Sequence, residues 1–227
     1  MLVLEFRLPY GENLTFPASK VINGGYTGRD AAAVQAHVEE LEKEGIAPPL
    51  RTPLFFPVPR DRVTLAAEVE VVGENTSGEV EYVLLVSGDD LFVTVASDHT
   101  DRTLERVDML ASKALCPNVL APVAWRYEEV QGHWDEIMIR SWIGEGRRTL
   151  RQEAPLAAIM APGDLMAEVA RSVKGPLEGV VILSGTVASR GEGSGVAGFF
   201  EFEMEDPRLG RRISWGYRIT RTDWYRP

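Results

Sequence analysis

Carboxylate side chains gather on two consecutive segments in the middle of the chain. Glu79 and Glu81 lie two residues apart where a period-two pattern predicts a strand, so both side chains point to one face. Asp98 ends the next predicted strand, and pairing of the two strands as a hairpin brings it near Glu79 and Glu81. Adjacent carboxylates repel one another and need a cation or a shared proton. Three of them form an oxygen-only site for a hard divalent ion, which favours Mg²⁺ over Zn²⁺.

The same acidic residues also fit an interpretation without a metal. Glu79 and Glu81 then belong to a solvated strand face, and Asp98 caps the helix predicted over residues 100–115. The two interpretations differ in geometry. Carboxylates more than about 8 Å apart would exclude a shared ion, because the distance from a metal ion to each ligand oxygen is ~2 Å.

A histidine and a glutamate share one face of a helix predicted over residues 30–44. His37 and Glu40 are three residues apart, and a carboxylate beside an imidazole raises its basicity, which suits a general base that activates water. The alternative is an ordinary edge of an amphipathic, acidic helix. Five prolines in residues 46–61 predict an extended connection that follows it. We therefore expect a small amino-terminal lobe over 1–50 and a larger domain over 51–227.

Two cations follow the carboxylates on the helix predicted over residues 100–115. Arg102 and Lys113 can hold an anionic substrate, and a lysine beside a metal can stabilise an enolate. The alternative is a surface pair that balances Glu105 and Asp108.

Further along the chain, residues 180–193 read as a strand that ends in a turn of small residues. The backbone amides of this turn and the Thr186 hydroxyl can bind a carboxylate, although a plain strand-end turn has the same composition. Cys116 follows a predicted helix and has no feature that would lower the pKa of its thiol, so we do not expect a catalytic cysteine.

Composition narrows the class of protein. The 227 residues carry a formal net charge of −10, which disfavours binding to nucleic acid. The absence of long apolar runs predicts no membrane span, and the single cysteine fits a reducing, cytoplasmic compartment. Many strands with few, irregularly placed helices predict an α+β fold.

Taken in order, these segments resemble the fumarylacetoacetate hydrolase superfamily. The segment Glu79-Val80-Glu81 is similar to the Glu-x-Glu of that family, and SDHTDR, residues 97–102, is similar to its N-D-x-x-x-R. Further similar segments are SKALCP (112–117), GEGRRTLRQ ending at Gln152, LSGTV (183–187) and HVEE (37–40).

The resemblance implies a mixed β-sheet roll and a homodimer. It also implies a metal-dependent hydrolase or lyase that acts on a small oxo acid or 1,3-dicarbonyl compound. The reaction would be carbon–carbon bond cleavage or decarboxylation through a metal-stabilised enolate. Its cofactor would be Mg²⁺, or Mn²⁺ or Ca²⁺. By position, the metal ligands would be Glu79, Glu81 and Asp98. The catalytic residues would be His37 and Glu40, which lie on a mobile lid, and Lys113. The substrate-binding residues would be Arg102, Gln152 and Thr186.

Two other functions remain open at this point. A non-catalytic relative of the same fold would bind a metabolite or another subunit. Glu105, which stands where the family usually has Gln, and the short segment between Glu81 and Asp98 motivate that alternative. A metal-free sheet protein with an interaction role would instead place the three carboxylates far apart.

Overall fold

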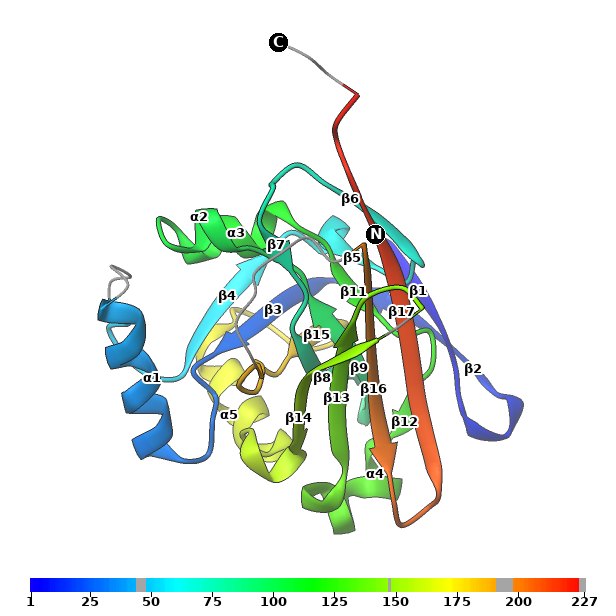
Figure 1. The fold of residues 1–227 in the computed structure, drawn as a ribbon. Helices are drawn as coiled ribbons and strands as arrows, with labels where there is room; N and C mark the ends of the chain where they lie inside the picture. Colours follow the sequence, from blue (N-terminus) through cyan, green and yellow to red (C-terminus); the bar gives the residue numbers. More distant parts are fainter. Residues whose placement is uncertain (44–47, 147, 191–197, 225–227) are drawn as a thin grey trace.

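The computed structural model describes residues 1–43, 48–146, 148–190 and 198–224 (Figure 1). Its larger sheet has eight strands in the order β4-β3-β15-β8-β9-β11-β5, with β12 paired to β9. The bounds of these strands are β3 (Lys20–Gly25), β4 (Leu54–Val58), β5 (Val63–Thr64), β8 (Val80–Ser87), β9 (Asp90–Asp98), β11 (Asn118–Leu120), β12 (Trp125–Arg126) and β15 (Val180–Leu183).

A second sheet of five strands packs against the first. Its order is β14-β13-β16-β17-β6, with β6 (Glu68–Val71), β13 (Met138–Ile143), β14 (Thr149–Pro155), β16 (Phe199–Asp206) and β17 (Arg211–Arg221). Two-stranded pairs are formed by β1 (Leu2–Arg7) with β2 (Asn13–Ala18) and by β7 (Thr76–Ser77) with β10 (Thr100–Asp101). The helices are α1 (Ala31–Lys43), α2 (Arg102–Glu105), α3 (Met109–Leu115), α4 (Tyr127–Val130) and α5 (Pro162–Ser172). Parallel and antiparallel pairs coexist in both large sheets, so the predicted α+β fold with mixed sheets is confirmed.

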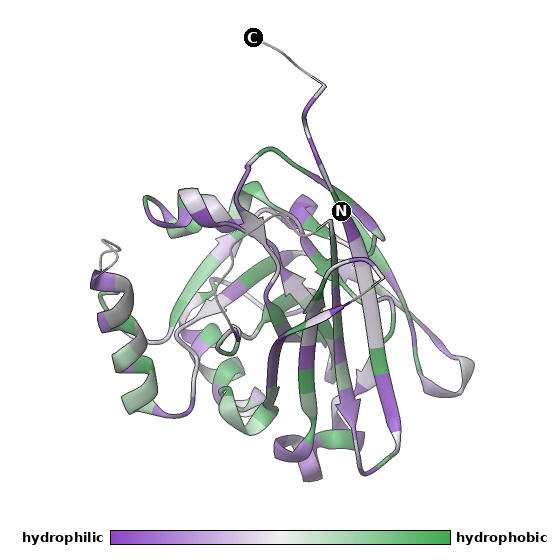
Figure 2. Ribbon diagram, in the orientation of Figure 1, coloured by the Kyte–Doolittle hydropathy of each residue, from purple (hydrophilic) through white to green (hydrophobic). Residues whose placement is uncertain are grey.

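Two apolar cores lie on opposite faces of the larger sheet. In β8, Tyr82 and Leu84 join the core shared with the five-stranded sheet, whereas Val83 and Leu85 join the core covered by the β1–β2 pair. Alternate residues of a strand point to opposite faces, which explains this division. Hydrophobic residues accordingly colour much of the central strands, and hydrophilic residues gather towards loops and strand ends (Figure 2). β8 is therefore a central strand buried on both faces.

The β8–β9 hairpin determines the register on which the acidic residues depend. Gly88 at the turn has a φ of 59°, which a residue without a side chain adopts at no steric cost. Pairing runs from Ser87 opposite Asp90 to Val80 opposite Ser97. The predicted hairpin is confirmed, and Asp98 follows directly at its open end.

The helix predicted over residues 100–115 is two helices, so this prediction is wrong in detail. Asp101 accepts hydrogen bonds from the amides of Thr103 and Leu104, and it begins α2. Asp108 accepts from the amide of Ala111 and begins α3. An aspartate that caps a new helix competes with continuation of the first one. The helix cap is therefore Asp101, and Asp98 is free of that role.

The amino-terminal segment contributes directly to the main sheet. The predicted helix over 30–44 is present as α1, where Asp30 accepts from the amides of Ala32 and Ala33. In the view of Figure 1, α1 lies at the left and β16 and β17 of the five-stranded sheet lie at the right. β3 pairs with both β4 and β15, so strand pairing crosses the expected lobe boundary at residue 50. None of the described helices is both long and apolar enough to span a bilayer.

Candidate metal centre

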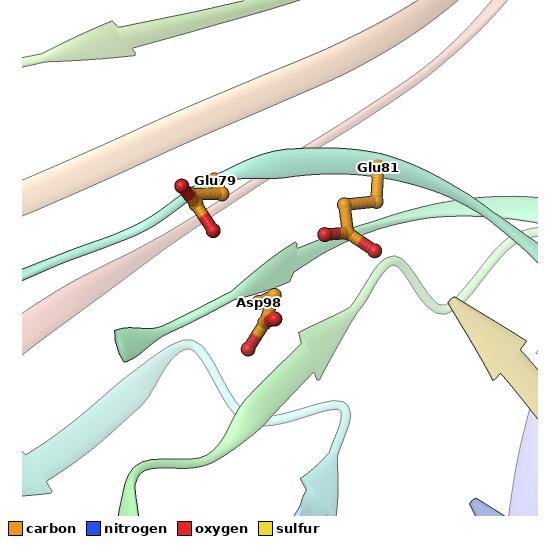
Figure 3. Close-up of side chains that lie close together, drawn as sticks. All are labelled: Glu79, Glu81 and Asp98. Atoms are coloured by element: carbon orange, nitrogen blue, oxygen red, sulfur yellow. The ribbon is translucent and has the colours of Figure 1, made fainter. Parts of the chain in front are cut away.

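Three carboxylates converge on one face of the β8–β9 hairpin. Glu79 and Asp98 exchange backbone hydrogen bonds of 3.1 and 2.9 Å, so their side chains lie directly opposite each other. Glu81 is two residues further along and points to the same face (Figure 3). One ligand oxygen from each of the three residues lies within 4.8 Å of the others. This convergence is the predicted geometry, and it excludes the interpretation in which the carboxylates lie far apart.

The cluster is buried, which changes its proton affinity. Glu81 is 1% exposed and Asp98 is fully buried. Burial raises the pKa of Glu81 well above its ordinary value of 4.5, the charge of Asp98 raises it further, and Lys113 opposes both effects. Burial and the neighbouring charge of Asp98 therefore favour the protonated form of Glu81, and a bound cation would favour the ionised form.

Lys113 on α3 supplies an internal positive charge. Its Nζ donates to Asp98 Oδ2 and lies 3.8 Å from Glu79 Oε2. Burial alone would lower the pKa of Lys113, but the charges of Asp98, Glu79 and Glu81 together raise it. The ammonium group is consequently charged inside the protein and offsets part of the repulsion between the carboxylates.

The remaining oxygen of Asp98 shows that the cluster fits a metal ion. Asp98 Oδ1 is buried and has no hydrogen-bond partner among the residues that the structure describes. Buried polar atoms normally have partners, so an oxygen in this position is available for coordination. Together with oxygens of Glu79 and Glu81 it forms the hard, oxygen-only donor set that divalent ions such as Mg²⁺, Mn²⁺ and Ca²⁺ prefer.

Gln152 and Thr186, which are predicted to bind substrate, hydrogen-bond the backbone between the two glutamates. Gln152 Oε1 accepts from the Val80 amide at 3.0 Å and from Ser141 Oγ at 2.8 Å. Its Nε2 donates to Thr186 Oγ1 at 2.7 Å and to the Val187 carbonyl at 2.8 Å. Thr186 Oγ1 in turn donates to the Val80 carbonyl at 2.8 Å. These side chains replace a neighbouring strand where β15 ends, and substrate binding by them stays a prediction.

The turn after β15 binds a carboxylate, as its composition suggested, but the carboxylate is Glu81 of the protein itself. The Gly185 amide donates to Glu81 Oε2 at 2.8 Å. Gly185 has a φ of 86°, and a Cβ there would lie 2.3 Å from Thr27 Oγ1. Only glycine fits this conformation and this close approach. The turn therefore orients Glu81 towards the other two carboxylates.

Arg102 on α2 lies beside the centre but is held by protein groups. Its guanidinium contacts Glu79 Oε1 at 3.0 Å, Glu105 Oε2 at 2.9 Å and Ser77 Oγ at 2.7 Å. Burial raises the pKa of Glu105, and the charge of Glu79 raises it further, whereas Arg102 and Lys113 lower it. The cations predicted as a surface pair in the alternative interpretation are thus part of the acidic cluster.

A hydrogen-bond network adjacent to Asp98 was not predicted from the sequence. His99 is fully buried, with Nδ1 2.7 Å from Tyr217 Oη and Nε2 2.9 Å from Thr76 Oγ1. Tyr217 Oη also lies 2.9 Å from Ser97 Oγ. The network joins β9 to β17 of the other sheet. Its partners are far apart along the chain, so spacing carries no signal for it.

We expect His99 to make stability depend on pH. Burial lowers the pKa of His99 from 6.5 to about 4. Between these values the unfolded chain binds a proton that the folded protein excludes, so the free energy of unfolding falls as pH drops from 6.5 towards 4. At ~1.4 kcal/mol per pKa unit the loss reaches about 3 kcal/mol. Urea unfolding at several pH values should show this loss in the wild type and a flatter profile in His99→Gln. Identical profiles would contradict the assignment.

The predicted water-activating pair lies outside what the structure describes. His37 and Glu40 belong to α1, but their side chains are not among the described ones. Their catalytic role on a mobile lid therefore stays a prediction.

A separate cavity of about 320 Å³ contains none of the three carboxylates. Its lining includes Arg29, Tyr127, His133, Trp134, Asp135 and Pro162. Two of the charges on this lining neutralise each other, since Arg29 Nη2 lies 2.5 Å from Asp135 Oδ1. The candidate metal centre and this cavity are therefore separate features of the described structure.

Comparison with known protein families finds one match. The family described as "Protein of unknown function (DUF2848)" matches residues 24–217. No curated protein sequence matches the chain.

Solved structures show where the fold recurs. Fumarylpyruvate hydrolase from Pseudomonas aeruginosa, in complex with Mn²⁺ and pyruvate, is 18% identical with a TM-score of 0.67 and covers 97% of each chain. A 2-keto-3-deoxyarabinonate dehydratase is 17% identical with a TM-score of 0.67, over 96% of this chain and 79% of that one. The 5-carboxymethyl-2-hydroxymuconate delta-isomerase from Mycobacterium smegmatis is 18% identical with a TM-score of 0.64, over 93% of this chain and 86% of that one. The chain has the fold of these proteins, and the predicted fold of the fumarylacetoacetate hydrolase type is confirmed.

Proposed function

The chain belongs to the DUF2848 family, and from the centre described above we propose that it is a divalent-metal-dependent enzyme. Its substrate is a small oxo acid or 1,3-dicarbonyl compound, and its reaction breaks a carbon–carbon bond by hydrolysis or decarboxylation. The homodimer and the identity of the ion as Mg²⁺, Mn²⁺ or Ca²⁺ belong to the same proposal.

One observation carries this proposal. The carboxylates of Glu79, Glu81 and Asp98 converge, and a buried oxygen of Asp98 has no hydrogen-bond partner among the residues that the structure describes. The P. aeruginosa hydrolase of the same fold binds Mn²⁺ together with pyruvate, which is an oxo acid. An oxygen-only donor set and a fold that accommodates an oxo acid beside an ion support the same class of chemistry.

The residues of the chain divide the work by position. A divalent ion held by Glu79, Glu81 and Asp98 would act as a Lewis acid on the substrate carbonyl. Lys113 holds a positive charge beside these carboxylates and would stabilise negative charge that develops on a substrate oxygen. His37 and Glu40 on α1 would take the proton from the attacking water in a hydrolysis. Closure of α1 over the centre would keep bulk water out.

The test is turnover with and without the ion. We expect the purified protein to consume an acylpyruvate with one carboxylate, and oxaloacetate less readily, in the presence of Mn²⁺. This activity should be lost in EDTA and in His37→Ala. Exposed Gln35 lies on the same helix, so Gln35→Ala is the matched control and should keep the activity. Binding of Mn²⁺ and of the oxo acid without turnover of either compound would instead support the non-catalytic, metabolite-binding alternative.

A further inference from the structure

We propose that Glu105 determines the charge of the ligand that the metal centre accepts, by favouring an oxo acid with one carboxylate over a dicarboxylate. This inference rests on the proposed function, because it takes Glu79, Glu81 and Asp98 as ligands of a divalent ion. It names Glu105 as a specificity-determining residue of the centre.

Arg102 is the guanidinium beside the centre, and Glu105 occupies one side of it. Arg102 Nη1 donates to Glu105 Oε2 at 2.9 Å, while Nη2 contacts Glu79 Oε1 at 3.0 Å and Nε donates to Ser77 Oγ at 2.7 Å. A guanidinium binds a carboxylate through paired N–H groups on one edge. A second substrate carboxylate would therefore have to displace Glu105, since Glu79 is needed by the ion.

The charge of the centre points in the same direction. The cluster joins the carboxylates of Glu79, Glu81, Asp98 and Glu105 with the cations of Lys113 and Arg102, so it holds two more carboxylates than cations. A divalent ion brings the formal charge to zero, so a bound monoanion leaves the loaded centre with one net negative charge and a bound dianion leaves it with two.

Glu105 lies close enough for its charge to be felt. Its side chain is 20% exposed and that of Arg102 is 19% exposed, so water screens the pair only in part. Glu105 also interacts electrostatically with Glu79, which is one of the three carboxylates of the centre, and with Lys113, which contacts two of them. Removal of its charge would leave the loaded centre with one net positive charge, and removal of the whole side chain would also free one side of Arg102.

The experiment compares two probes that differ by a single charge. Oxalate is a dianion and oxamate is its near-isosteric monoanion, and both chelate a divalent ion through two neighbouring donor groups. Calorimetry first measures Mn²⁺ affinity, and then the affinity of the Mn²⁺-loaded protein for each probe. We expect Glu105→Gln to raise the ratio of oxalate to oxamate affinity at least about tenfold over the wild type. A second neutral variant, Glu105→Ala, should shift the ratio in the same direction.

Glu105→Asp keeps the charge and serves as the matched control, with a ratio near that of the wild type. An unchanged ratio in both neutral variants, with Mn²⁺ bound normally, would overturn the role of Glu105 and leave the proposed function standing. Failure of the wild type to bind Mn²⁺ would overturn the proposed function and this inference with it.

Discussion

Replacement of Glu81 by Gln should lower the affinity for Mn²⁺ by more than about 100-fold. This loss exceeds the ~10–100-fold expected when a residue that only supports a metal ligand is replaced. Glutamine has the shape of the protonated glutamate but provides no negative charge. Its carbonyl can still accept the hydrogen bond that Gly185 donates to Glu81 Oε2 at 2.8 Å. Since burial raises the pKa of Glu81, neutral Gln is also the less costly occupant of this site in the absence of metal. We therefore expect an intact fold with a defective centre.

Isothermal calorimetry in buffers of different ionisation enthalpy checks this prediction. The wild type should release a proton as Mn²⁺ binds, because burial raises the pKa of Glu81 whereas the ion binds its carboxylate form, and the affinity for Mn²⁺ should rise with pH. Proton release should disappear in Glu81→Gln. Glu128→Gln makes the same chemical change at an exposed position on α4 and should bind like the wild type. Unchanged affinity in Glu81→Gln would count against the three-carboxylate centre.

The second large effect concerns stability. Lys113→Met should lower the free energy of unfolding in EDTA by about 3–5 kcal/mol, as expected when one partner of a buried ion pair is removed. Methionine has a similar length, so the variant keeps the volume but leaves Asp98 and Glu79 without the Lys113 ammonium. For a chain of this size the loss corresponds to a melting temperature lower by roughly 6–20 °C.

Added Mn²⁺ separates this electrostatic explanation from a simple packing defect. A divalent ion replaces the missing positive charge, so saturating Mn²⁺ should raise the melting temperature of Lys113→Met by at least as much as it raises that of the wild type. Exposed Lys174 provides the control, because Lys174→Met should change neither the free energy of unfolding in EDTA nor the rise in melting temperature that Mn²⁺ causes. A Lys113→Met protein that is as stable as the wild type in EDTA would show that the ammonium does not offset the carboxylates.

Local pairing explains why the carboxylates could be found from the residues alone. β8 and β9 are consecutive strands joined by a short turn at Gly88, so their alternating pattern and the turn together determine which residues face each other. Glu79, Glu81 and Asp98 then fall on one face without any information about the rest of the molecule. The same reasoning failed for the segment after Asp98, where capping by Asp108 divides one expected helix into α2 and α3.

The sequence by itself determined the acidic hairpin, the helix that begins at Asp30 and the α+β class, because each depends on residues close together along the chain. Only the tertiary structure decided that Gln152 and Thr186, which are 72 and 106 residues from Val80, hydrogen-bond its backbone. The same holds for the hydrogen bond between Tyr217 and His99, which are 118 residues apart. The tertiary structure also decided that Glu105 shares Arg102 with Glu79. Such contacts depend on how two curled sheets pack, and packing juxtaposes side chains whose separation along the chain carries no periodic signal.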